Sequence, residues 1–119
     1  MQVPLQITVR NMQQSDALEA HIRDKVAKLA EFHPRITSCR VTVEESAKHH
    51  HKGRLFQVRV DVRVPQHEIV ATRDQHEDVY VALRDAFDAT KRQLEDVARE
   101  QRGDVKAHAA RDGAGEGEG

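Results

Sequence analysis

The stretch RLFQVRVDVRV, residues 54–64, indicates the fold because apolar and polar side chains alternate along almost all of it. Its apolar side chains share one face of an extended chain: Phe56, Val58, Val60, Val62 and Val64. A period of two residues is typical of a β-strand with one buried side. Residues 36–45 and 68–73 show the same pattern, and Pro65-Gln66-His67 provides a short turn. The three segments therefore predict an antiparallel meander.

Upstream of the meander, residues 3–9 alternate in the same way and predict a further strand. Ser15 follows as a candidate N-cap, and Pro34 marks the end of a helix between them. The apolar positions of this amphipathic helix recur at helical spacing: Leu18, Ile22, Val26, Leu29 and Phe32.

Downstream, Asp74 and Glu77 fit a capping box at the start of a second helix. An apolar stripe from Val79 to Val97 predicts that this helix continues to about Arg102, where Gly103 suits a C-cap. The Gly/Glu-rich residues 104–119 show no apolar pattern, so we expect a disordered tail there and one folded domain over residues 1–103.

The expected order is β-α-β-β-β-α, an α+β fold with a four-stranded mixed sheet. The strand–helix–strand connection at the start predicts that its two strands are parallel. Because each strand has one apolar face and each helix one apolar stripe, both helices must cover the same side of the sheet. The other side of this two-layer fold is left for solvent or a partner.

Composition narrows the class of protein. The chain has 119 residues, 13.5 kDa and one cysteine, so it fits a single domain without an internal disulfide framework. No stretch approaches the roughly 18 apolar residues of a membrane span, and the N-terminus lacks a basic region followed by an apolar run. We expect a cytoplasmic protein that does not associate with membranes.

Two features of the sequence could indicate catalysis or metal binding, but a structural explanation is favoured for each. Cys39 falls on the apolar side of its strand, where a buried small hydrophobe is more common than a nucleophile. The histidines His49, His50 and His51 have no Cys or carboxylate within the loop 46–53 to complete a metal site, which favours a solvated loop. The sequence contains no constellation of residues that indicates catalysis, and we expect no metal and no cofactor.

Exposed bases are the stronger signal. Residues 1–73 carry 12 Lys/Arg and 8 Asp/Glu, whereas residues 74–103 carry 5 and 8, so a polyanion partner must bind a local patch. Aromatic residues are only 3% of the chain, which argues against base stacking as the main mode of recognition. Backbone and shape recognition of structured RNA fits these bases better.

A series of short motifs carries a family resemblance. They are Ile7-Thr8, Ser15-x-Ala17-Leu18, Lys25-x-Ala27-Lys28-Leu29, Arg35-Ile36, Glu68-Ile69-Val70-Ala71, His76-Glu77-Asp78-Val79-Tyr80-x-Ala82-Leu83, Asp88 and Arg92-Gln93-Leu94. In this order and spacing, residues 3–101 resemble the short ribosome hibernation-promoting factors, the ribosome-associated translation inhibitor family.

The resemblance implies a fold related to double-stranded RNA-binding domains and no catalysed reaction. It implies binding to the small ribosomal subunit, its 16S rRNA and the whole ribosome, at the decoding region. Occupying that site blocks translation and preserves idle ribosomes in stationary phase or stress. Separately, we expect a monomer off the ribosome. The bases that match the family's RNA-facing positions, and are expected to contact phosphates, are Lys25, Lys28, Arg84, Lys91 and Arg92. Arg23, an exposed base of the first helix, is a further candidate for RNA binding.

Two other classes of function remain open at this stage. Acidic residues within the second helix, such as Glu95, Asp96 and Glu100, would suit a module of the same fold that binds a protein or another structured RNA. A small metal- or thiol-dependent enzyme, built on the histidine loop and Cys39, is the remaining alternative.

Overall fold

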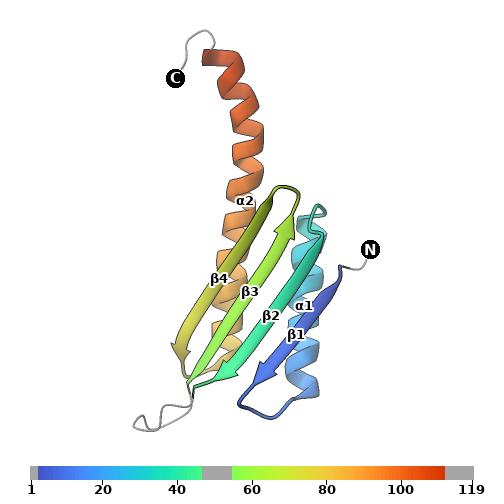
Figure 1. Ribbon diagram of the computed structural model, residues 1–119, viewed down its shortest axis with the longest axis vertical. Helices are drawn as coiled ribbons and strands as arrows, with labels where there is room; N and C mark the ends of the chain where they lie inside the picture. Colours follow the sequence, from blue (N-terminus) through green and yellow to red (C-terminus); the bar gives the residue numbers. More distant parts are fainter. Residues whose placement is uncertain (1–2, 47–54, 112–119) are drawn as a thin grey trace.

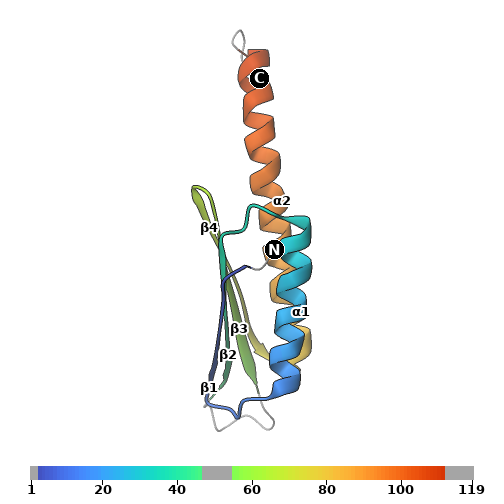
Figure 2. The same ribbon diagram turned by 90° about the vertical axis from the view of Figure 1, so that its right-hand side faces the viewer.

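The computed structural model describes residues 3–46 and 55–111. Its elements follow the order β1 (Leu5–Arg10), α1 (Asp16–Phe32), β2 (Ser38–Glu45), β3 (Phe56–Val64), β4 (His67–His76) and α2 (Val79–Arg111). The strands form one sheet in the order β1-β2-β3-β4. Both helices lie on the same face of this sheet (Figures 1 and 2). The expected two-layer α+β fold is therefore confirmed.

The sheet is mixed, as the connections require. β1 pairs with β2 in parallel, with Leu5 opposite Cys39, because α1 carries the chain back to the same end of the sheet. The pairs β2–β3 and β3–β4 are antiparallel, and a register shift between Phe56 and Val58 marks an irregularity in the second pair. Strand bounds differ from the expected ones by at most three residues, and β4 continues to His76.

The core lies between the sheet and the helices. Val41, Val58 and Val60 in the two central strands have no exposed surface, and α1 buries Ile22 completely. Full burial of one such side chain is worth about 1.5–3 kcal/mol, so these positions stabilise the packing of sheet against helix. The one buried polar residue among those described, Thr90, donates from Oγ1 to the carbonyl oxygen of Ala86 at 2.8 Å.

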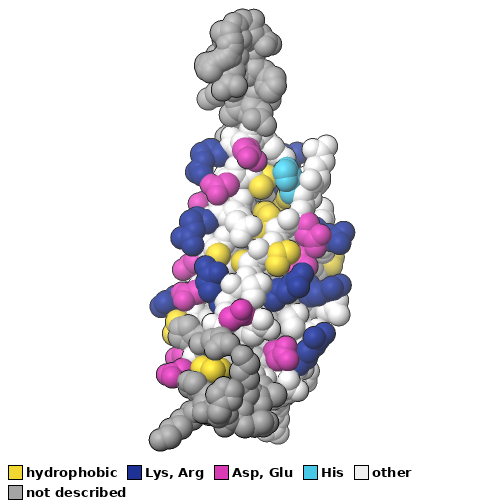
Figure 3. Space-filling model, turned by 60° about the vertical axis from the view of Figure 1, so that its left-hand side comes forward, with side chains coloured by type: hydrophobic (Ala, Val, Ile, Leu, Met, Phe, Trp, Pro, Cys, Tyr) yellow, Lys and Arg dark blue, Asp and Glu magenta, His cyan; other side chains and the backbone are white. Residues whose placement is uncertain are grey.

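The opposite face of the sheet is polar. Arg59 and Arg63 on β3 lie there beside acidic neighbours, with 3.7 Å from Arg59 to Asp61 and 3.9 Å from Arg63 to Glu68. On the side of the molecule that carries β4 and α2, basic and acidic side chains are interspersed (Figure 3). No helix in the described part of the chain is long and apolar enough to cross a membrane.

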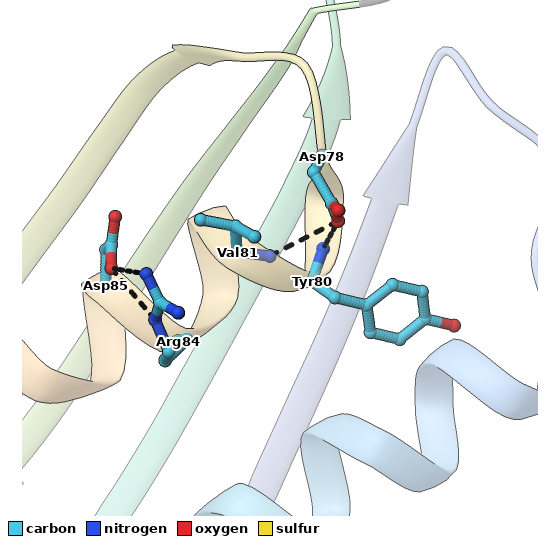
Figure 4. Close-up of polar contacts among 5 residues, drawn as sticks. All are labelled: Asp78, Tyr80, Val81, Arg84 and Asp85. Atoms are coloured by element: carbon cyan, nitrogen blue, oxygen red, sulfur yellow. Dashed lines mark hydrogen bonds and ion pairs between the residues drawn. The ribbon is translucent and has the colours of Figure 1, made fainter.

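Of the two N-caps predicted from the sequence, one is confirmed and the other is wrong. Ser15 caps α1 as expected, since its Oγ accepts a hydrogen bond from the Leu18 amide at 3.2 Å. The capping box at Asp74 and Glu77 is wrong: Asp78 accepts from the Tyr80 and Val81 amides at 2.9 and 3.3 Å (Figure 4). Asp74 belongs to β4 and accepts from Gln57 on β3 at 2.7 Å, because the strand runs further than its alternation indicated.

The expected end of the second helix is also wrong. α2 continues through Gly103 to Arg111, so Gly103 lies in the helix interior and not at a C-cap. An interior glycine costs only about 1 kcal/mol relative to alanine, and residues 104–111 include three alanines. Residues 112–119, the remainder of the expected tail, lie outside the described residues. The domain boundary at residue 103 stays a prediction.

Phe32 does not join the apolar face of α1. Its side chain is 69% exposed, whereas Leu18, Ile22, Val26 and Leu29 are buried as predicted. The spacing from Leu29 is helical, but six residues from Val26 correspond to a rotation of about 240° around the helix. Phe32 therefore lies on the flank of α1 and not on its buried side.

Candidate nucleic-acid interface

The two helices lie side by side and run in the same direction (Figures 1 and 2). Two side-chain contacts join them. The rings of His21 on α1 and Tyr80 on α2 meet edge to face with centroids 4.9 Å apart. Further along, the Lys91 ammonium on α2 lies 5.9 Å from the centre of the Phe32 ring on α1. In Figure 4 the Tyr80 ring extends from the start of α2 toward α1.

These contacts place four bases along one seam. Residues three, four, seven and eleven positions apart share a helix face, so Lys25 and Lys28 follow His21 on the side of α1 that borders α2. By the same spacing, Arg84 and Lys91 follow Tyr80 on the side of α2 that borders α1. We call these four residues, Lys25, Lys28, Arg84 and Lys91, the interhelical strip.

Acidic neighbours neutralise the strip only in part. Lys28 lies 3.3 Å from Asp24, and Arg84 contacts Asp85 at 3.1 Å. Exposed pairs of this kind are worth about 0–1 kcal/mol, so a phosphate can displace them. Among the described residues, Lys25 and Lys91 take part in no ion pair. The strip can therefore offer four cations to a polyanion that lies along the helices.

Two of the six bases expected to bind RNA lie elsewhere. Arg23 borders a hollow shared with Ile7 and Val9 of β1, on the side of α1 away from α2, and both its Nε and Nη2 bond Glu19 at 3.0 and 2.9 Å. Arg92 is exposed one residue beyond Lys91, turned by about 100° toward the outer face of α2. Helical spacing thus places Lys25, Lys28, Arg84 and Lys91 toward the boundary between the helices, and Lys28 also lines a hollow with Val3 and Asp24.

The open face of the sheet is a second polar surface. A shallow hollow of about 470 Å³ there is lined by Arg10, Arg40 and Arg59 together with threonines and two carboxylates, Glu44 and Asp61. These charges are mixed, and Glu44 already accepts from the Asn11 amide at 3.1 Å. The open face therefore offers less uncompensated positive charge than the interhelical strip.

The residues that suggested thiol or metal chemistry are Cys39 and the histidines His49 to His51. Cys39 is 4% exposed, and burial, with a smaller contribution from Asp61, raises the pKa of its thiol to about 12, which confirms it as a buried core residue. Residues His49 to His51 lie outside the described residues. Within residues 3–46 and 55–111, no group of three or more His, Cys, Asp or Glu is placed to hold a metal ion.

The sequence reasoning missed the aromatic rings in the seam. Tyr80 is 42% exposed and Phe32 is 69% exposed, and they contact opposite ends of the same inter-helix boundary. A signal was present, since Phe32 follows His21 by eleven residues, which is close to three full turns. That spacing predicts a shared face with His21, Lys25 and Lys28.

Burial also affects His33, the residue after α1. Desolvation lowers its pKa, Glu95 acts in the opposite direction, and Lys91 reinforces the lowering. Its Nε2 atom is buried and has no hydrogen-bond partner among the described residues. His33 is therefore a neutral ring at pH 7 with an unused polar atom.

Fold and surface together define a small two-layer α+β module with cations from two neighbouring helices, and without a cluster that indicates catalysis in the described residues. The chain belongs to the family described as Sigma 54 modulation protein / S30EA ribosomal protein, whose model matches residues 5–102. This is the ribosome hibernation promotion factor family, and its members are ribosome-associated regulators of translation and not enzymes. The family resemblance of the motifs is confirmed.

A relative with a curated name is the ribosome hibernation promotion factor of Deinococcus radiodurans, 28% identical over 89 residues. The match covers 75% of this chain and 46% of that protein, so the chain spans about half the length of this curated relative.

Two solved structures share the fold. A ribosomal subunit interface protein from Coxiella burnetii superposes with a TM-score of 0.69 and 17% identity, over 81% of this chain and 98% of that one. The N-terminal domain of Protein Y from Thermus thermophilus gives a TM-score of 0.60 and 20% identity, over 82% and 99%. At these identities the comparison concerns the fold alone.

Proposed function

We propose that this protein inhibits translation by binding the small ribosomal subunit at the decoding region, and that it thereby preserves idle ribosomes in stationary phase or stress. Binding uses the interhelical strip, with Arg92 as an additional contact on the outer face of α2. The proposed partners are 16S rRNA and the whole ribosome. The protein acts in the cytoplasm, where ribosomes are, and is a monomer when it is not bound.

The observation that carries this proposal is the alignment of α1 with α2. Because His21 meets Tyr80 and Phe32 meets Lys91, cations from two separate helices form one strip. RNA phosphates follow one another along a strand, and a row of Lys and Arg side chains can contact several of them at once. Such contacts position a protein on structured RNA without reading its sequence.

The family and the relatives support the choice of partner. The curated relative is named for promoting ribosome hibernation, and one solved neighbour is titled a ribosomal subunit interface protein. A rigid two-layer domain held at the decoding region would exclude messenger and transfer RNA by occupying their space. This mechanism needs no bond to be made or broken, which fits a family without catalytic activity.

Co-sedimentation with ribosomes tests the proposal. The purified protein is centrifuged through sucrose with small subunits, large subunits and whole ribosomes, at low and at high salt. We expect retention on small subunits and whole ribosomes that weakens as salt rises. Absence of retention at every salt concentration contradicts the proposal, and would favour a different RNA or a protein as the partner of this fold.

A cell-free translation assay tests the inhibitory step. Added protein should lower synthesis from a reporter messenger RNA, and the double variant Lys25→Gln/Lys91→Gln should inhibit less. Arg23→Gln serves as the matched control, since Arg23 is an exposed base of α1 on the side away from the strip. Equal inhibition by all three proteins would exclude the interhelical strip as the binding surface.

A further inference from the structure

A hollow of about 370 Å³ opens where α1 ends, between the β3–β4 turn and α2. Its walls are largely apolar, formed by Phe32, Pro65, Leu94 and Val97, and its polar lining includes His33 and Gln66. Pockets that hold small planar ligands have volumes from about 300 Å³ upward and combine apolar walls with a few polar groups. The hollow is therefore large enough for one aromatic heterocycle.

The exposed ring of Phe32 forms part of this hollow. At 69% exposure Phe32 gains little from burial in the free protein, and its ring is accessible to a partner except where the Lys91 ammonium lies over it. The Lys91 ammonium, which belongs to the interhelical strip, lies 5.9 Å from the centre of this ring, although Lys91 does not line the hollow itself. A ligand in contact with Phe32 is thus continuous with the surface proposed to hold phosphates.

The polar groups at this place select the kind of ligand. The polar side chains that line the hollow are those of His33, Arg35, Gln66 and Gln101, and an aliphatic ligand would displace water from them without replacing its hydrogen bonds. A planar ring with hydrogen-bonding edges can pack against the apolar walls and bond these polar side chains at the same time.

We propose that this hollow receives one unpaired nucleobase of the bound RNA, stacked on Phe32, while Lys91 contacts an adjacent phosphate. The inference rests on the proposed function, because the base belongs to RNA held along the interhelical strip. Stacking on aromatic side chains accepts any base, since every base has a π-face. The strip then supplies salt-dependent affinity, and the hollow supplies a preference for RNA with an unpaired nucleotide.

The test compares two RNA hairpins of equal length with wild-type protein and two variants. One hairpin carries a single bulged 2-aminopurine, and the other is fully paired. We expect wild-type protein to bind the bulged hairpin more tightly and to quench its fluorescence. Phe32→Ala should weaken binding to the bulged hairpin by about 5- to 140-fold, the range for one stacked base. Phe32→Tyr keeps the ring and should keep the preference.

Salt dependence separates stacking from charge. Phe32→Ala removes no cation, so the slope of log affinity against log salt should stay at the wild-type value, whereas Lys91→Gln should flatten it. A melting curve checks that Phe32→Ala leaves the fold intact, as expected for an exposed side chain. Small subunits replace the hairpins in a parallel titration, where Phe32→Ala should again bind more weakly at an unchanged slope.

The outcomes distinguish this inference from the proposed function. Equal affinity of wild-type protein for both hairpins, or Phe32→Ala binding subunits as wild-type does, overturns the base pocket and leaves the ribosome proposal standing. Absence of binding to subunits and to both hairpins overturns both. Saturable binding of adenosine monophosphate alone, undiminished by the Lys25→Gln/Lys91→Gln variant, would assign the hollow to a free nucleotide and overturn the inference as stated.

Discussion

Replacing Lys25 with glutamine tests the interhelical strip most directly. Lys25 is half-buried on the side of α1 that borders α2, and no ion pair involves it among the described residues. The change removes one charge and keeps a long side chain with good helix propensity. It should alter the free energy of unfolding by less than about 0.5 kcal/mol.

The expected magnitude follows from the number of cations. If the four bases of the strip each neutralise one phosphate, the strip alone should contribute about −3.6 to the slope of log affinity against log salt. Between about 50 and 200 mM salt, this contribution would decrease affinity about 150-fold. With Lys25→Gln the contribution becomes about −2.7 and the decrease about 40-fold.

The assay is equilibrium binding of N-terminally labelled protein to small subunits over a series of salt concentrations. Arg23→Gln is the control, since it removes an equivalent charge two residues away on the opposite side of α1. Its slope should equal the wild-type slope. The reasoning is refuted if Lys25→Gln leaves the slope unchanged, or if Arg23→Gln flattens it as much as Lys25→Gln does.

Three further predictions concern stability and reactivity. Asp78→Ala should lower the free energy of unfolding in urea by about 1 kcal/mol through loss of the α2 cap, and Asp74→Ala should have a smaller effect if Asp78 is the cap. The Cys39 thiol, whose pKa burial raises to about 12, should resist a thiol reagent at about pH 8 until urea unfolds the protein, and rapid labelling of the folded state would contradict its burial. Because burial lowers the pKa of His33 in the folded state, the unfolded state binds more protons below about pH 6.5, so the contribution of His33 to stability should decline as pH falls through that range. His33→Gln should remove this part of the pH dependence, and parallel stability curves for the two proteins would contradict it.

Local patterns predicted most of the fold because burial enforces them. Val58, Val60 and Val62 alternate along β3, and each is fully buried against the helices. Ile22 and its apolar neighbours on α1 follow the helical period for the same reason. Because one core buries all these side chains, the pattern determines which face of each strand and helix is buried. The order of the strands in the sheet then follows from the short connections between them.

The start and the end of α2, which the sequence predicted wrongly, each depend on a choice between two local structures. Asp74 and Asp78 are both acceptable N-caps by residue type, and the pairing of β4 with β3 decides between them by keeping Asp74 in the strand. Gly103 resembles a C-cap residue, yet the helix continues because its cost there is small compared with the run of helix formers around it. Neither competition can be resolved by reading one segment alone.

The candidate site was predicted only in part, because it requires two helices to be aligned. Sequence identified Lys25, Lys28, Arg84 and Lys91 as exposed bases through the family resemblance, but it also included Arg23, which lies on the far side of α1. Side-chain contacts between helices, such as His21 with Tyr80, determine which bases share a surface. Those contacts are tertiary: spacing can place His21 and Phe32 on one face of α1, but it does not tell which residues of α2 they meet.

The same alignment explains how a chain of net charge −1 can be proposed to bind RNA. Exposed charges are largely screened beyond about 8 Å at physiological salt, so a bound phosphate responds to the strip and its neighbours more than to the whole protein. The neighbours include Asp24 and Asp85, whose pairs with Lys28 and Arg84 must be displaced when phosphate binds. This competition lowers affinity without abolishing it and makes it sensitive to salt. Binding of this kind is reversible, whereas a strip of four unopposed cations would release RNA less readily.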